Sequence, residues 1–251
     1  MNIDEFNRII GIDDSYKAPE KIMGILMEGG ERRSDYFQAI ISADNDLSHD
    51  TLQSYYEDEQ ALRGQHKQDY TPTSVSRLTG MLTGDANGTV YDPTAGTGSM
   101  IISRWWQDYV DSGMPWEYRP CEHMYVCQEL SDRAIPFLLT NLMLRGMNAA
   151  VIHGDTLTMS DIKGVFFVQN DAEDALAFSN LNVMPYSDEV RAFFNIHSWA
   201  PESERYEPHM ESPPHIWLTR EQAERIAGRS QQPTHSEQTT RGKYVQDAIT
   251  D

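Results

Sequence analysis

The chain has 251 residues, of which 39% are hydrophobic and 24% charged, a balance typical of a globular protein. Its 39 acidic residues outnumber its 20 basic residues, and the net charge of −19 excludes binding to nucleic acid by bulk electrostatic attraction. Only two cysteines are present, and neither a signal peptide nor a membrane-spanning apolar run is recognisable, so we expect a reduced, cytoplasmic setting and no membrane.

Residues 1–63 predict a small helical segment. Ile22, Ile25 and Leu26 follow the spacing i, i+3, i+4, which places them on one face of a helix. The pair Gly29-Gly30 interrupts this pattern and predicts the end of that helix. A short bundle with a solvated acidic face accounts for these features.

Residues 64–200 alternate helices with short apolar strands. Helices are predicted over 74–82, from Ser99 onward and over 133–145, and strands over 89–91, 124–127, 149–152, 165–168 and 178–183. This alternation predicts parallel βαβ units and a doubly wound α/β sheet. Because three further strands cannot be found after the fourth, we expect a truncated sheet. Residues 201–251 are Pro-rich and polar, and they predict a C-terminal extension with a flexible tail.

The sharpest motif is a glycine-rich loop between the first strand and the helix after it. Residues 92–99 read Asp-Pro-Thr-Ala-Gly-Thr-Gly-Ser. Glycines let backbone N–H groups approach a ligand closely at the positive end of a helix dipole. In doubly wound folds, ligands bind outside the carboxyl ends of the strands. Two glycines alone would be an ordinary tight turn, but the full string in this context predicts a ligand-binding loop.

Two carboxylates follow the second and third strands. Glu129 stands where a carboxylate commonly accepts both hydroxyls of a ribose, although a lone Glu there would be a solvated surface residue. Asp155 can accept a hydrogen bond from an adenine amine, and it can also cap the segment that follows. The ligand-binding prediction requires Glu129 to lie beside the glycine loop.

Residues 64–186 resemble the N6-adenine DNA methyltransferases, specifically the modification subunits of type I restriction-modification systems and their phage or plasmid relatives. Five segments carry the resemblance in the family's order, over residues 68–72, 90–100, 128–130, 141–146 and 153–157. The resemblance implies a Rossmann-like class I methyltransferase core with S-adenosylmethionine (SAM) as cofactor. The residues that it implies for SAM binding are Tyr70, Thr71, Pro72, Asp92, Thr94, Gly96, Thr97, Gly98, Glu129, Asp155 and Thr156.

The resemblance also assigns roles within this set. Residues 70–72 would pack on the methionine end of SAM, and the glycine-rich loop would hold its amino-acid part. Glu129 would bind the ribose, and Asp155 would bind the adenine.

The catalytic motif departs from the family's pattern. The family has Asn or Asp, then Pro-Pro and an aromatic residue, which together orient the target amine and stack on the flipped base. The corresponding place here ends in Val183, Met184, Pro185 and Tyr186, so valine stands where the polar residue belongs. Asn182 lies one residue early and would serve only if the backbone bulges. The resemblance thus implies Asn182, Pro185 and Tyr186 as catalytic residues of a degenerate motif.

Two functions follow from the resemblance. The first is SAM-dependent methylation of adenine N6 in DNA, with a separate specificity subunit as partner because residues 187–251 are too short and acidic for a recognition region. The second is an inactive SAM-binding homologue that acts as a partner subunit or an acidic anti-restriction decoy. Methylation of RNA or of protein is a third option, because the residues implied for cofactor binding do not indicate which molecule accepts the methyl group.

Two further patterns carry less weight. The string Ser-Pro-Pro-His at 212–215 resembles a second catalytic motif, but it follows a polar stretch and is typical of a Pro-rich loop. The eight histidines form no H-x-x-x-H or H-E-x-x-H pair, so no metal site is predicted. The sequence does not predict the oligomeric state.

Overall fold

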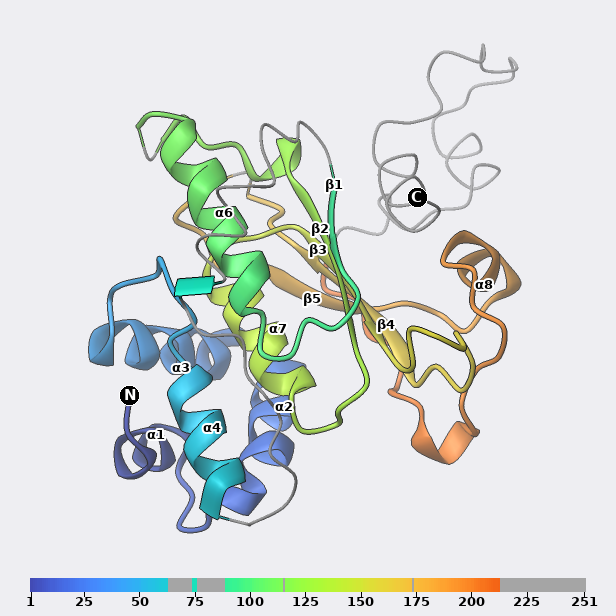
Figure 1. The fold of residues 1–251 in the computed structure, drawn as a ribbon, viewed down its shortest axis with the longest axis horizontal. Helices are drawn as coiled ribbons and strands as arrows, with labels where there is room; N and C mark the ends of the chain where they lie inside the picture. Colours follow the sequence, from blue (N-terminus) through green and yellow to red (C-terminus); the bar gives the residue numbers. More distant parts are fainter. Residues whose placement is uncertain (63–73, 76–88, 115, 173, 213–251) are drawn as a thin grey trace.

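The structure is a computed structural model that describes residues 1–62, 74–75, 89–114, 116–172 and 174–212 (Figure 1). The predicted SAM contacts Tyr70, Thr71 and Pro72 lie outside these residues. So do most of the predicted helix over 74–82 and the predicted flexible tail. No helix in the described ranges is long and apolar enough to cross a membrane.

The N-terminal part is helical, as predicted. It contains four α-helices: α1 (Ile3–Ile10), α2 (Ala18–Glu28), α3 (Gly30–Ala43) and α4 (Gln53–Leu62). The side chain of Asn2 caps α1 by accepting a hydrogen bond from the backbone N–H of Glu5. The chain turns from α2 into α3 at Gly29 and Gly30, where the φ angles are +68° and +60°. Glycine suits this turn because residues with side chains rarely adopt such positive φ angles.

A five-stranded sheet follows, in the order β1-β2-β3-β4-β5. Its strands are β1 (Thr89–Asp92), β2 (Met124–Glu129), β3 (Ala149–His153), β4 (Gly164–Gln169) and β5 (Asn180–Val183). The first three are parallel, with α6 (Ser99–Asp111) and α7 (Ile135–Leu144) as their crossover helices. These elements confirm the predicted βαβ units.

Strand β4 corrects the prediction of a parallel sheet, because it is antiparallel to both β3 and β5, whereas β5 runs in the same direction as the first three strands. The described residues of the connections 154–163 and 170–179 contain no helix. A parallel return needs a crossover of about a dozen residues or more, usually a helix. The short connections therefore turn each strand back along its neighbour, and the fifth strand ends up next to the fourth at the sheet edge opposite β1.

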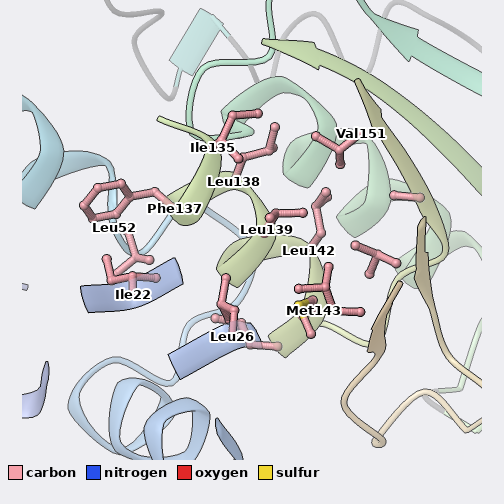
Figure 2. Close-up of a cluster of buried hydrophobic side chains, with 14 of the residues drawn as sticks. Ile22, Leu26, Leu52, Ile135, Phe137, Leu138, Leu139, Leu142, Met143 and Val151 are labelled. Atoms are coloured by element: carbon pink, nitrogen blue, oxygen red, sulfur yellow. The ribbon is translucent and has the colours of Figure 1, made fainter. Parts of the chain in front are cut away.

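Helix α7 lies between the sheet and the N-terminal helices. Figure 2 shows its side chains, including Leu139 and Leu142, between Val151 of β3 and the α2 residues Ile22 and Leu26. All ten residues of α7 are buried, which accounts for its almost entirely apolar sequence. The N-terminal helices and one face of the sheet therefore share a single hydrophobic core.

The opposite face of the sheet packs against a second, smaller core. Its strand residues include Val126 and Ile152, which alternate along the strands with residues of the first core. Helix α8 (Asp188–Phe193) covers this face through Val190, and Phe194 and Ile196 follow it in the same cluster. The sheet is thus buried on both faces.

Residues 201–212, the start of the predicted C-terminal extension, pack onto the body of the protein. The backbone of His209 pairs with that of Val183 at the outer edge of β5. The carboxylate of Glu211 accepts two hydrogen bonds of 2.7 Å from the guanidinium of Arg33 in α3. Composition alone does not show this packing, because its contacts are specific and distant in sequence.

Asn182 joins this C-terminal stretch to the sheet. Its side-chain amide donates to the carbonyl oxygen of Phe167 and to the hydroxyl of Ser212, at 3.1 and 2.8 Å. Its side-chain oxygen accepts from the backbone N–H groups of Glu211 and Ser212, both at 2.9 Å. Asn182 is 1% exposed, so these four contacts satisfy an amide that water does not reach.

We expect Asn182→Ala to lower the free energy of unfolding by roughly 2–3 kcal/mol, because buried backbone N–H groups would lose their acceptor. Urea denaturation measures this change. Asn180→Ala is the matched control on the same strand, since that side chain makes one hydrogen bond, to Asp171, and is partly exposed. Equal stability of the two variants would contradict the structural role of Asn182.

Candidate functional site

The glycine-rich loop lies between the end of β1 and the start of α6. Asp92, the last residue of β1, accepts a hydrogen bond of 3.0 Å from the backbone N–H of Thr94. Gly96 and Gly98 have φ angles of +57° and +102°. A Cβ atom on Gly98 would also lie 2.9 Å from the side chain of Leu138 in α7. Gly98 is therefore needed for the loop to pass close to α7, and Gly96 is needed for its left-handed backbone.

Glu129 lies beside the loop, as the ligand-binding prediction requires. It is the last residue of β2, and its Oε2 accepts a hydrogen bond of 2.8 Å from the backbone N–H of Gly96. Its Oε1 accepts from the N–H of Ser131 at 2.7 Å. The N–H of Ala95 in turn donates to the carbonyl oxygen of Gln128 at 2.9 Å. These bonds fix the loop against the end of the second strand.

The turn after β3 meets the same loop. The hydroxyl of Thr156 donates to the carbonyl oxygen of Pro93 at 2.5 Å. The carboxylate of Asp155 accepts from the N–H of Leu157 and the hydroxyl of Thr158, at 2.9 and 3.1 Å. Asp155 thus caps the turn that follows it, which is one of its two predicted roles. The carboxyl ends of all three parallel strands converge here.

A pocket of about 760 Å³ opens at this convergence. Its volume falls in the range usual for small-molecule sites, roughly 300–1,000 Å³. The lining residues are Gln53, Tyr56, Asp92, Pro93, Thr94, Ala95, Gly96, Thr97, Ser99, Met100, Glu129, Leu130, Ala134, Asp155, Thr156 and Leu157. This set contains all the predicted SAM contacts within the described residues except Gly98. Gly98 instead lies against Leu138 of α7.

The pocket is negatively charged. Three carboxylates, Asp92, Glu129 and Asp155, line it, and no lysine or arginine is among its described lining residues. Burial, with the charge of Glu129 as a smaller contribution, raises the pKa of the Asp92 carboxyl. Such a lining favours a ligand that carries positive charge over a phosphate-bearing one. Across the described part of the chain, no group of three or more His, Cys, Asp or Glu side chains could hold a metal ion.

Helix α4 contributes two lining residues that the sequence did not predict. Gln53 and Tyr56 lie at i and i+3, and the Oε1 of Gln53 is 3.1 Å from the hydroxyl of Ser99. Burial raises the pKa of the Tyr56 hydroxyl. Their spacing was the only available signal, and it is equally typical of an ordinary helix face.

The structure does not bring the predicted catalytic residues Asn182, Pro185 and Tyr186 to this pocket. At about 4.8 Å per strand, β5 lies roughly 19 Å across the sheet from β1. The amide of Asn182 is taken up by its four structural contacts. Pro185 is exposed, and the Tyr186 hydroxyl lies 2.8 and 2.9 Å from the carbonyl oxygens of Lys163 and Tyr206, which share its one proton. Because β4 is antiparallel to both neighbours, β5 runs in the same direction as β1, and its carboxyl end lies at the same edge of the sheet as the pocket. The strand order, which places β5 at the side opposite β1, therefore causes this separation.

The alternative motif at 212–215 is only partly within the described residues. The hydroxyl and the backbone N–H of Ser212 are both hydrogen-bonded to Asn182 of the edge strand β5. Ser212 therefore also lies away from the pocket. Pro213, Pro214 and His215 lie outside the described residues.

Comparison with known proteins identifies the family. None of the curated proteins matches the chain. A family model described as N-6 DNA Methylase matches residues 47–199, well over half of the chain. The match begins inside the N-terminal segment, so it takes in α4 with its pocket residues as well as the sheet. The chain therefore belongs to the N-6 DNA methylase family.

Proposed function

We propose that the pocket binds SAM and that the protein acts in N6-adenine methylation of DNA as the holder of the methyl donor. The observation that carries the proposal is the hydrogen bond between the Glu129 carboxylate and the N–H of Gly96. It unites the two predicted halves of a nucleoside site, the acid after the second strand and the loop after the first. Three parallel strands with two crossover helices support a Rossmann-like core behind this site.

The charge of the pocket supports SAM rather than a nucleotide phosphate. SAM carries a positive sulfonium and a positive ammonium group, and it supplies an electrophilic methyl group when bound. Asp92 and the loop would hold the amino-acid part, Glu129 the ribose and Asp155 the adenine. Tyr70, Thr71 and Pro72 are proposed to pack on the methionine end. Methyl transfer to an amine then depends mainly on how the acceptor is positioned.

A second candidate function is SAM binding without methyl transfer by this chain alone. The contacts of Asn182 and Tyr186 favour it, because their polar groups are already bonded within the protein and lie away from the pocket. In this case the chain would act as a partner subunit or as an acidic anti-restriction decoy. The net charge of −19 suits both roles, and it also suits a specificity subunit that supplies the contacts to DNA.

Calorimetry tests SAM binding. Gly96→Val should abolish it, because the added side chain points away from protein atoms and into the space proposed for the amino-acid part of SAM. Gly11→Val is the matched control, since Gly11 has a similar φ of +71°, equally open surroundings and a place outside this pocket. SAM affinity that is unchanged in Gly96→Val, or equally lost in Gly11→Val, would contradict the pocket assignment.

Glu129→Ala should weaken SAM binding by roughly 1.5–3 kcal/mol, the range for hydrogen bonds to a charged group. The same titration measures the effect. Glu122→Ala serves as control, because Glu122 precedes the same strand and is exposed. A loss below that range would leave Glu129 with the structural role of holding Gly96.

Incubation of the protein with tritiated SAM and adenine-containing DNA separates the two candidate functions. Label in the DNA that Gly96→Val abolishes would establish methylation by this chain. SAM binding without transfer, from the same preparation, would establish the second function. If a specificity subunit is required, transfer should appear only when the full complex is supplied.

A further inference from the structure

A buried carboxylate from the N-terminal segment contacts the glycine-rich loop from behind. Asp50, 5% exposed, lies just before α4. Its Oδ2 accepts a hydrogen bond of 2.5 Å from the hydroxyl of Thr97 and lies 3.0 Å from the hydroxyl of Ser99. Its Oδ1 accepts from the side-chain amide of Asn141 in α7 at 2.7 Å. Asp50 thus joins the loop to the helix on which it rests.

A second set of bonds holds the carboxylate and the loop together. The amide of Asn141 also donates to the backbone carbonyl of Thr97 at 2.9 Å. The guanidinium of Arg145 donates to the side-chain oxygen of Asn141 at 3.0 Å, and to the carbonyl oxygens of Leu47 and His49 at 3.1 and 2.5 Å. The segment before α4 is therefore fixed to α7 and its C-cap residue at Asp50 itself and at the residues that precede it.

The charges in this cluster are buried and matched. Arg145 is 2% exposed, and burial lowers its pKa to about 10, against the opposing effect of the Asp50 charge. Removing one member of a buried, hydrogen-bonded network leaves its partners unsatisfied. The loop residues Thr97 and Ser99 belong to the pocket lining, whereas Asp50 does not. The cluster therefore acts on the pocket from outside it.

We propose that Asp50 is a positioning residue that holds the glycine-rich loop in its binding shape through Thr97 and Ser99. Through it, the N-terminal segment sets the geometry of the pocket before any ligand arrives. The consequence for affinity rests on the proposed binding of SAM, but the effect on the loop does not.

Hydrogen exchange on the ligand-free protein tests the proposal. The amides of Ala95, Gly96 and Gly98 are hydrogen-bonded in the loop. In Asp50→Ala we expect them to exchange about tenfold faster, the change that corresponds to losing one charge-assisted hydrogen bond. Exchange in β3, on the far side of α7, should stay unchanged. Asp50→Asn should have a smaller effect, because it keeps one acceptor oxygen.

Asp46→Asn is the matched control. Asp46 and Asp50 each accept a hydrogen bond of 3.0 Å from the backbone N–H two residues on, but Asp46 is exposed and does not contact the loop. If Asp50→Ala does not fold, Thr97→Val removes the same bond from the loop side, and Thr97→Ser should restore slow exchange.

The outcomes separate this proposal from the proposed function. Faster exchange confined to the loop, together with an SAM affinity reduced about tenfold, supports both. Loop exchange that matches the Asp46→Asn control, or that rises equally throughout the protein, overturns the positioning role of Asp50. Wild-type protein that does not bind SAM overturns the proposed function, while the exchange measurement still decides the role of Asp50.

Discussion

The site depends on the backbone N–H of Gly96 meeting the carboxylate of Glu129. This contact requires β1 and β2 to be parallel and in register, so that the loop after one strand reaches the last residue of the other. It also requires the left-handed backbone at Gly96, which turns the N–H toward the second strand. Sheet topology, glycine placement and acid placement are thus three conditions for one hydrogen bond.

Helix α7 supports this arrangement from below. Its apolar side chains fill the space between the sheet and the N-terminal helices, as Figure 2 shows. Asn141 of α7 donates a hydrogen bond to the loop, and Arg145, the residue after α7, donates to the segment before α4; both side chains are buried. A single helix therefore supplies both the core of the fold and the polar support of the pocket. The family match that starts at residue 47 agrees with this continuity.

The sequence predicted those parts of the site that depend on local patterns. The glycine string and Asp155 follow strands and Glu129 ends one, and parallel strands bring their carboxyl ends to one edge of a sheet. Gln53, Tyr56 and Asp50 were not predicted, because their contacts with the loop span more than 40 residues and leave no spacing signal. The residue pattern of an acidic helix such as α4 is the same whether the helix faces solvent or lines a pocket.

The direction of β4 and the place of β5 in the strand order were the main features of the fold that the sequence did not show. Strand β4 is mostly apolar and β5 alternates asparagine with apolar residues, patterns that are the same for a strand of either direction, so they identify the strands without their direction. The short connections reverse β4 and place β5 beside it, and the resulting strand order puts Asn182 at the side of the sheet opposite β1. Asn182 resembles a catalytic motif residue in the sequence, but only the structure shows its contacts with Glu211 and Ser212.

The pairing of His209 with Val183 has a consequence for self-association. An uncovered edge strand offers free N–H and C=O groups to a strand from another molecule, which is a common route to aggregation. Here the chain's own backbone occupies the outer side of β5 at this point, and the ion pair between Arg33 and Glu211 attaches the covering segment to α3. This margin of the sheet is thereby protected against growth by strand addition between copies.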